Sequence, residues 1–226
     1  MLSLLFAPGV RAQLPATAGQ GWYTGNVYIP LPNQFRILAT GELNDGTNYE
    51  YQQWIVGAGV GFRWKRIGEL AHLVNINPDK ESRVVVGAGY EYLWTNTDGN
   101  ETREDRVTFG VTPRYRPLGR WLIEDRNRFE FRWVDGRYST RYRNRLQFEF
   151  DVKSHDFRFT PYVAGEIFYS FSSGTVNEQQ YAVGIQWPWR RLFMIDTYYL
   201  YQHTTSAPTS TNVFGVQFSL YLRNAL

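Results

Sequence analysis

The chain has 226 residues, a formal net charge of +3 and no cysteine, and 17% of its residues are aromatic. Without cysteine it can form neither disulfides nor a thiolate metal site. Its mean hydropathy is −0.43, and no apolar run approaches the ~18 residues that a transmembrane helix needs. A polar chain this rich in aromatic residues is typical of a transmembrane β-barrel, because each strand of such a barrel is only half apolar.

Arginine supplies nearly all of the positive charge. Only three of the 24 basic residues are lysines, namely Lys65, Lys80 and Lys153. Lysine is the usual solubilising charge of a protein surface, whereas the guanidinium group pairs with carboxylates through several hydrogen bonds and stacks on rings. The bias therefore favours arginines held in ordered ion-pair networks.

The first residues resemble the end of a secretory signal peptide. A short apolar stretch precedes Val10-Arg11-Ala12, a small-x-small pattern that would leave Gln13 as the new N-terminus. We interpret residues 1–12 as a signal-peptide remnant, with a first strand or a disordered leader as the alternative. Residues 13–226 carry no linker composition, so we expect one domain there.

Alternating apolar and polar residues predict strands along the whole chain. Many segments have 12 to 14 residues, longer than the ~9–11 that a tilted membrane-spanning strand needs. The segments are 22–30, 34–43, 51–64, 83–95, 104–116, 121–134, 140–152, 157–171, 179–189, 191–203 and 212–223. Bacterial barrels have an even strand number, so we expect 12 strands, with 10 as the alternative; residues 13–21 or 66–76 could hold the hidden strand.

The predicted connections alternate in length along the chain. Three are tight, at residues 116–120, 153–156 and 189–191, and three are longer and polar, at 96–103, 172–177 and 203–211. Short turns at one rim and longer loops at the other are typical of an outer-membrane barrel.

Residues 126–152 show the alternation most clearly. One face of the two predicted strands carries arginine, glutamate and glutamine, and the other carries residues such as Phe129, Phe131, Trp133, Phe148 and Phe150. Successive side chains of a strand point to opposite faces, so one face is ionic and the other apolar. A soluble sandwich or lipocalin-like barrel would turn the ionic face to water, and a membrane barrel would turn it inward.

Three features favour the membrane barrel. Trp54 and Trp64 share a face ten residues apart, which at ~3.3 Å per residue and ~40° tilt gives roughly the 25 Å between the aromatic girdles of a barrel. Other tryptophans, Trp22 among them, also lie near strand ends, where they suit a membrane interface. Glycines on the polar face, at 57, 59, 61, 87 and 89, leave room for long arginine side chains from the facing wall. We assign to the girdle Trp54, Trp64, Trp94, Trp121, Trp133 and Trp187.

The chain also resembles a known family. The similarity runs in order over about residues 22–222 and is most specific in Arg-Tyr-Arg-Asn-Arg-Leu at 141–146 and Pro161-Tyr-Val-Ala-Gly-Glu-Ile-Phe-Tyr169. It extends to Gln52–Arg63, Val86–Tyr90 and Tyr198–Gln202. These motifs are similar to domain-of-unknown-function family 2490, a family of predicted outer-membrane barrels of Gram-negative bacteria. Gln179-Gln180, where an Asn-Arg pair is expected, departs from its pattern. The resemblance implies the fold and the location and no chemistry.

With the aromatic residues outside, the fifth to eighth predicted strands turn many charged side chains into the lumen. The predicted lumen-lining residues are Arg106, Arg114, Arg116, Arg126, Arg128, Arg132, Arg141, Arg143, Arg145, Arg158, Glu130, Glu149 and Glu166. Asp151 and the rim acids Glu104, Glu124 and Asp156 leave this wall net positive. Arginines along a water-filled pore favour anions, but arginine–carboxylate ladders also brace narrow barrels without conducting. Both interpretations stay open.

Other chemistry has little support in the sequence. His203, at a strand end and followed by Thr204, Thr205 and Ser206, is a weak signal for a lipid-modifying enzyme. Glu130 and Glu149 would be ionised among so many arginines, which is unsuitable for a general acid. Neither a metal site nor a cofactor is expected, since the Asp-Gly pairs at 45–46, 98–99 and 135–136 are turn signals.

We therefore expect an all-β protein, a closed antiparallel up-and-down barrel that is integral to the cell outer membrane after export across the inner membrane. Its expected role is unassigned or that of a narrow anion-preferring, porin-like channel, and no enzymatic activity is expected. The alternatives are the lipid-modifying enzyme and a soluble secreted barrel that binds an anionic ligand. The expected partners are outer-membrane lipid and lipopolysaccharide, the barrel-assembly machinery and small anionic solutes, without nucleic acid, and the protein is expected to be a monomer.

Overall fold

The computed structural model describes residues 17–46, 51–66, 76–117, 119–155, 157–190, 192–205 and 209–222. These residues form twelve strands and one short 3-10 helix. The strands are β1 (Thr17–Pro30), β2 (Phe35–Gly46), β3 (Tyr51–Arg66), β4 (Ser82–Thr97), β5 (Asn100–Tyr115), β6 (Trp121–Val134), β7 (Arg137–Phe150), β8 (Val152–Ser154), β9 (Phe157–Ser170), β10 (Thr175–Trp189), β11 (Phe193–Thr204) and β12 (Thr209–Tyr221), and the helix is η2 (Pro78–Glu81). None of the described helical residues forms a helix long and apolar enough to cross a membrane.

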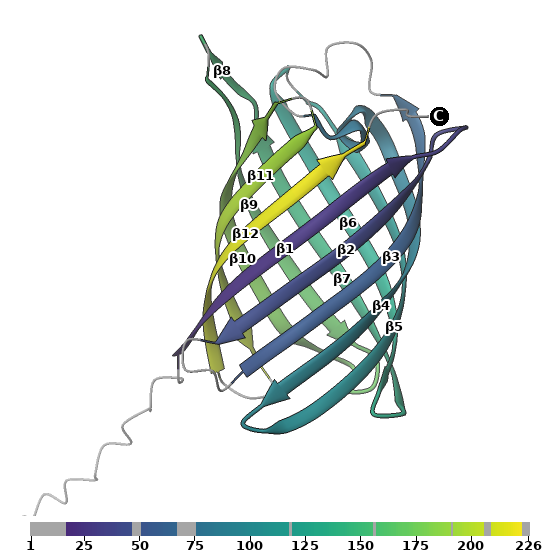
Figure 1. Cartoon of the computed structure of the whole chain (residues 1–226), viewed down its shortest axis with the longest axis vertical. Coiled ribbons are helices and arrows are strands. Elements are labelled where there is room, and N and C mark those ends of the chain that lie inside the picture. Colours follow the sequence, from purple (N-terminus) through teal and green to yellow (C-terminus); the bar gives the residue numbers. More distant parts are fainter. Residues whose placement is uncertain are drawn as a thin grey trace, which may run out of the picture.

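Eleven of the strands close into a tilted barrel, and β8 projects from one rim as a hairpin with the start of β9 (Figure 1). Neighbouring strands are antiparallel except at the closing seam, where β1 pairs with β12 in parallel, from Thr17–Ser210 to Tyr28–Tyr221. The closed all-β barrel is confirmed. The twelfth strand stands outside its wall, and the expectation of an even number does not apply because one parallel pair lets eleven strands close.

Each of the eleven predicted segments corresponds to one strand of the wall. Of the two places suggested for a hidden strand, residues 17–21 belong to the start of β1 and so form part of the wall. Residues 13–16 lie outside the described residues, as do 67–75 of the other candidate.

Two stacked tyrosine rings lie at the upper end of the parallel seam between β1 and β12. The rings of Tyr28 and Tyr221 stack inside the barrel with centroids 4.6 Å apart, and the guanidinium of Arg36 lies 4.9 Å above the Tyr28 ring. The Leu222 N–H donates to the Tyr28 carbonyl at 3.0 Å. The seam is therefore held by side chains where its ladder ends.

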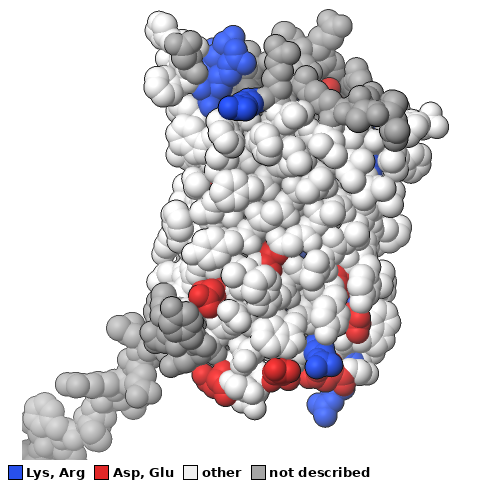
Figure 2. Space-filling view, viewed as in Figure 1, with Lys and Arg blue, Asp and Glu red and all other residues white. Residues whose placement is uncertain are grey.

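The apolar face of the strands lies outside. Trp54, Trp64, Trp121, Trp133 and Trp187 are between 38% and 52% exposed, and Trp94 is paired with Trp54 on the same face. The prediction for Trp22 is wrong, because its side chain points into the lumen and its Nε1 donates to Gln20 Oε1 at 2.9 Å. The face seen in Figure 2 shows a broad, largely uncharged band below an upper end with basic residues, and the lower end carries acidic residues with basic ones among them.

The turns follow the expected distribution of loop lengths only in part, since the connection between β10 and β11 is tight as predicted but others differ. At the lower rim, β4–β5 and β6–β7 are joined by two-residue turns, Asp98-Gly99 and Asp135-Gly136, with positive φ at both positions. This is the type I′ geometry that Asp-Gly favours in hairpins. Residues 96–103, predicted as a longer loop, therefore lie mostly in strands. The longest connection, residues 67–81, is at the upper rim, with the turns that were predicted to be tight.

Two tyrosine rings cover glycines inside the wall. An added Cβ at Gly184 would lie 2.6 Å from the Tyr162 ring, whose hydroxyl is held by a 3.1 Å hydrogen bond to Asp196. Gly215 lies under Tyr198 in the same way. Glycine is needed at these positions because the ring from the neighbouring strand takes the place of a side chain.

We expect Gly184→Ala to lower the free energy of unfolding by about 1–3 kcal/mol, the usual cost of overpacking, because the anchored Tyr162 ring cannot move away freely. Urea unfolding in lipid vesicles, followed by tryptophan fluorescence, measures the change. Gly41→Ala is the matched control, since an added Cβ there meets nothing within 4 Å. Equal stability of the two variants would contradict the role of the ring.

Candidate functional site

The ion pairs of the lumen centre on Glu130 of β6, whose side chain is fully buried. Arg128 and Arg141 each place an Nη2 atom 2.6 Å from its carboxylate. The Nη1 atom of Arg143 lies 3.1 Å from the same carboxylate, and the Nε atom of Arg106 lies 3.9 Å from it. A buried carboxylate is costly unless charges and hydrogen bonds compensate it, and here four arginines do so.

A second carboxylate, that of Glu166 on β9, continues the cluster toward the upper rim. It lies 2.9 Å from Arg143 Nε, 3.2 Å from Arg126 Nη2 and 4.0 Å from Arg145 Nη1. The strand register produces this contact, because Arg145 is paired with Arg126 on one side and with Glu166 on the other. Arg143 thus bridges the Glu130 and Glu166 carboxylates.

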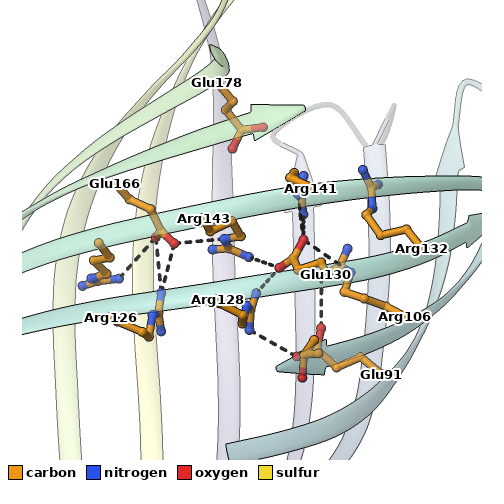
Figure 3. Close-up of polar contacts among 12 residues, drawn as sticks. Glu91, Arg106, Arg126, Arg128, Glu130, Arg132, Arg141, Arg143, Glu166 and Glu178 are labelled. Carbon is orange, nitrogen blue, oxygen red and sulfur yellow. Dashed lines mark hydrogen bonds and ion pairs between the residues drawn. The ribbon is translucent and has the colours of Figure 1, made fainter. Parts of the chain in front are cut away.

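Two further carboxylates extend the cluster toward the lower rim. Glu91 of β4 lies 3.0 Å from Arg106 and 3.4 Å from Arg128. Glu104 of β5 lies 2.7 Å from Arg132 and 2.8 Å from Arg106. These contacts join the residues into one connected set across five neighbouring strands (Figure 3).

We call this set the arginine network. Its members are Arg106, Arg126, Arg128, Arg132, Arg141, Arg143, Arg145, Glu91, Glu104, Glu130 and Glu166. Seven guanidinium groups share four carboxylates, so the network carries excess positive charge. Glu178 of β10 also points toward it (Figure 3), but among the described residues no ion pair joins the two.

An aromatic ring supports the network beside Arg141 and Arg143. Phe168 of β9 is only 2% exposed although it points into the lumen. The guanidinium carbons of Arg143 and Arg141 lie 4.3 and 5.0 Å from its ring centroid. Stacking on a ring holds a guanidinium group without using its N–H donors, so these donors stay free for Glu130 and Glu166.

The other predicted lumen residues lie near the upper rim. Arg114 Nε is 2.6 Å from Glu124 and Arg116 Nη1 is 3.6 Å from Asp151. Glu149 is buried beside Lys80. Arg158 differs from the prediction. It stands opposite Lys153 in the strand register of the β8–β9 hairpin, where its side chain is exposed outside the lumen.

The helix η2 crosses the upper mouth of the barrel. Its Asp79 forms an ion pair with Arg36 of β2. Its Lys80 Nζ lies 2.5 Å from Glu149 of β7 and donates to Gln186 Oε1 of β10 at 2.7 Å. Asp79 and Lys80 are both buried. Asp79 contacts β2, and Lys80 contacts β7 and β10, which flank β9 several strands away around the ring. The helix therefore acts as a latch across this opening.

A cavity of about 180 Å³ lies in the lumen beside the network. Its floor is the glycine-rich inner face of β3 and β4, with Gly57, Gly59, Gly61, Gly87 and Gly89, and Arg126 and Arg128 of β6 reach it from the other side. The Arg126 side chain is 35% exposed, the highest fraction among the ion-paired arginines described here. Glycines thus face arginines, in the relation that their sequence positions suggested.

Comparison with known proteins now gives the family. The profile described as "Protein of unknown function (DUF2490)" matches residues 19–213. The chain belongs to the DUF2490 family. The resemblance seen in the sequence motifs is thereby confirmed, and no curated protein matches the chain.

Several solved structures are similar to the chain at low identity. A "Bacterial polysaccharide outer membrane secretin" aligns with a TM-score of 0.50 and 8% identity over 84% of this chain, which spans 65% of that protein's length. An "Anion-selective porin from Comamonas acidovorans" aligns with a TM-score of 0.40, 10% identity and coverages of 83% and 53%. The siderophore receptor PirA from Pseudomonas aeruginosa aligns with a TM-score of 0.31 and 14% identity, over 84% of this chain and 35% of the receptor. The first likeness supports the barrel fold of this DUF2490 protein, and the other two carry no further argument.

Several residues of the site were missed by reasoning from the sequence. Glu91 has the same strand parity as Gly87 and Gly89, so alternation could have placed it in the lumen had the fourth strand been considered. Nothing in the sequence indicates that Asp79 and Lys80 turn into the barrel mouth, because alternation does not apply to a loop.

Of the residues named for the catalytic alternative, Ser206 lies outside the described residues, and His203 lies on β11. His203 has the outward parity of Tyr199 and Tyr201 on β11 and is paired with Ser210 of β12. The described part of the chain holds no group of three or more histidine, aspartate or glutamate side chains suited to a metal ion.

In this DUF2490 protein we expect Glu130→Gln to lower the free energy of unfolding by about 3–5 kcal/mol, the cost of removing one partner from a buried charge cluster. Four guanidinium groups would then face each other without their shared carboxylate. Glu101→Gln, at an exposed position of the lower rim, is the control and should change stability by less than about 0.5 kcal/mol. Urea midpoints in lipid vesicles compare them, and similar midpoints would show that the arginines do not depend on Glu130.

Proposed function

We propose that this DUF2490 barrel resides in the outer membrane and is a narrow, anion-preferring channel that η2 closes in the conformation described here. The observation that carries the proposal is the arginine network beside the glycine-walled cavity, where seven guanidinium groups share four carboxylates. Positive side chains along a water-filled path favour anions over cations.

The outer-membrane location is supported by the surface of the barrel. Exposed tryptophans stand at both ends of an apolar band, as lipid and water interfaces require. The upper rim exposes the basic residues Arg120, Lys153, Arg158 and Arg190, whereas the lower rim is mixed and exposes Asp98, Glu101 and Asp135 together with Arg103 and Arg137. A basic rim suits contact with the phosphates of lipopolysaccharide, so this end would face outward.

The path for an anion would run along the β2–β4 side of the lumen. The guanidinium of Arg126 is partly exposed there, and the buried Nε of Arg128 has no hydrogen-bond partner among the described residues. The exposed Arg126 side chain offers N–H donors to a small anion, and the Arg128 guanidinium adds positive charge beside it. The opposite reading, in which the network only braces the wall, predicts a barrel that carries no current.

Purified protein in a planar bilayer under a KCl gradient should show a reversal potential that indicates anion preference. Arg126→Gln should reduce the anion-to-cation permeability ratio by roughly fivefold, which corresponds to the ~1 kcal/mol between unit charges 4 Å apart in water. Glu166 keeps Arg143 and Arg145 in this variant, so the fold should be retained.

Arg158→Gln is the matched control for that measurement, because Arg158 is exposed at the rim outside the lumen. It should leave the permeability ratio unchanged. The absence of any current from the folded parent, or equal selectivity of the Arg126→Gln variant, would refute the channel and favour the bracing role.

The latch gives a second expectation. Replacing Lys80 by Met together with Glu149→Gln removes the ion pair and leaves no buried charge behind, so the barrel should open more often in the same bilayers. Lys153→Met, in the exposed β8 hairpin, is the control and should leave the open probability unchanged. Unaltered opening in the double variant would show that η2 does not limit conduction.

A further inference from the structure

A polar cluster interrupts the apolar outer face of β6 and β7. Asp125 and Asn127 of β6 have the same outward parity as Phe129 and Phe131, and Asn144 of β7 is paired with Asn127. Asn144 Nδ2 donates to Asp125 Oδ1 at 2.6 Å and to Asn127 Oδ1 at 3.1 Å. We call Asp125, Asn127 and Asn144 the outer polar cluster.

The cluster lies at the middle of the apolar band. Asn127 is six residues from Trp121 and six from Trp133, the girdle residues at the two ends of β6. At ~3.3 Å per residue and ~40° tilt, it is roughly 15 Å from each girdle level. Lipid at that depth offers neither water nor hydrogen-bonding groups.

One part of the cluster has a local explanation. Pro113 of β5 falls between the registered pairs Val111–Asn127 and Arg114–Glu124, and so lies opposite Asp125. Proline has no N–H to donate to the neighbouring strand. Instead, Asn127 Nδ2 donates to the Asp125 carbonyl oxygen at 3.3 Å, which accounts for an amide side chain at position 127.

The carboxylate of Asp125 has no such explanation. Among the described residues, no side chain donates to its Oδ2 atom, and the second N–H of the Asn127 amide has no acceptor. A charged group on the lipid face of a barrel is unfavourable. Among the described residues, the outer polar cluster therefore presents two acceptors without a donor, Asp125 Oδ2 and Asn144 Oδ1, and one free donor, in a region where only another protein can satisfy them.

We propose that this face of the barrel binds a second copy of the chain around a two-fold axis. In such an isologous contact each copy presents the same patch to the other, so the free Asn127 N–H of one copy meets the free Asp125 oxygen of its partner. The described part of the outer band carries no arginine or lysine between the rims, so an amide is the donor that a second copy can offer.

The surroundings of the cluster suit a protein contact. Phe129, Leu146 and Phe148 are 44%, 39% and 40% exposed and flank the polar side chains on the same face. Asparagine side chains that bond between elements in a membrane promote their association. A dimer would bury the polar centre inside an apolar rim, in place of the expected monomer.

The absence of cysteine from the chain permits a direct test in native membranes. Leu146→Cys places one thiol beside the proposed axis, and Val60→Cys places one on the outer face of β3, where Val60 is 50% exposed. Under copper–phenanthroline oxidation, Leu146→Cys should form a disulfide-linked dimer at least tenfold faster than Val60→Cys. Adding Asp125→Leu and Asn144→Leu to Leu146→Cys should remove this difference.

Each result has one meaning. Equal cross-linking of the Leu146→Cys and Val60→Cys proteins would overturn the proposal, and so would dimers that persist after Asp125→Leu and Asn144→Leu. A cross-link to a product of any mass other than twice that of the chain would identify a different partner and also refute the second copy. Heat-modifiable gel migration confirms that every variant is folded, and the result does not depend on whether the barrel conducts ions.

Discussion

Closure of the sheet in a medium without water is the constraint on which the rest of the structure depends. Each backbone N–H and C=O within hydrocarbon must find a partner in the protein, so a β wall has to be a ring without edges. Eleven strands can meet this requirement only if one pair is parallel, and β1 and β12 form that pair. The Tyr28–Tyr221 stack strengthens the seam at the upper end, beside the Arg36–Asp79 contact of the latch.

Closure also determines where charge can lie. Because lipid covers the outside, long charged side chains turn inward. Within the narrow lumen, positive and negative side chains must compensate each other. Arginine suits this arrangement better than lysine, since its fork can bridge two carboxylates, as Arg143 does between Glu130 and Glu166. Sharing the carboxylates among more numerous guanidinium groups stabilises the wall and leaves excess positive charge beside the cavity. Bracing and anion preference can thus arise from the same residues.

Local alternation explains how much could be predicted from the sequence. The eleven strands and the inward direction of Arg128 or Arg143 depend only on a period of two, which a strand shows by itself. The closing pair depends on how strands at opposite ends of the chain meet, so an even number was wrongly expected. Arg158 alternates correctly but lies beyond the wall, in a hairpin. Asp79 and Lys80 enter the lumen from a loop, where no periodicity relates a residue to a face.

The same alternation gives meaning to its exceptions. A polar residue with outward parity contradicts the pattern that places Phe129 and Phe148 in lipid, so it requires a reason of its own. Pro113 provides one for Asn127, because a missing backbone donor must be replaced by a side chain. It provides none for the carboxylate of Asp125, whose free oxygen lies at a depth where neither water nor a cation of this chain reaches it. Every carboxylate of the arginine network has guanidinium partners, whereas this one has only an amide, and a second protein surface satisfies its free oxygen at least cost.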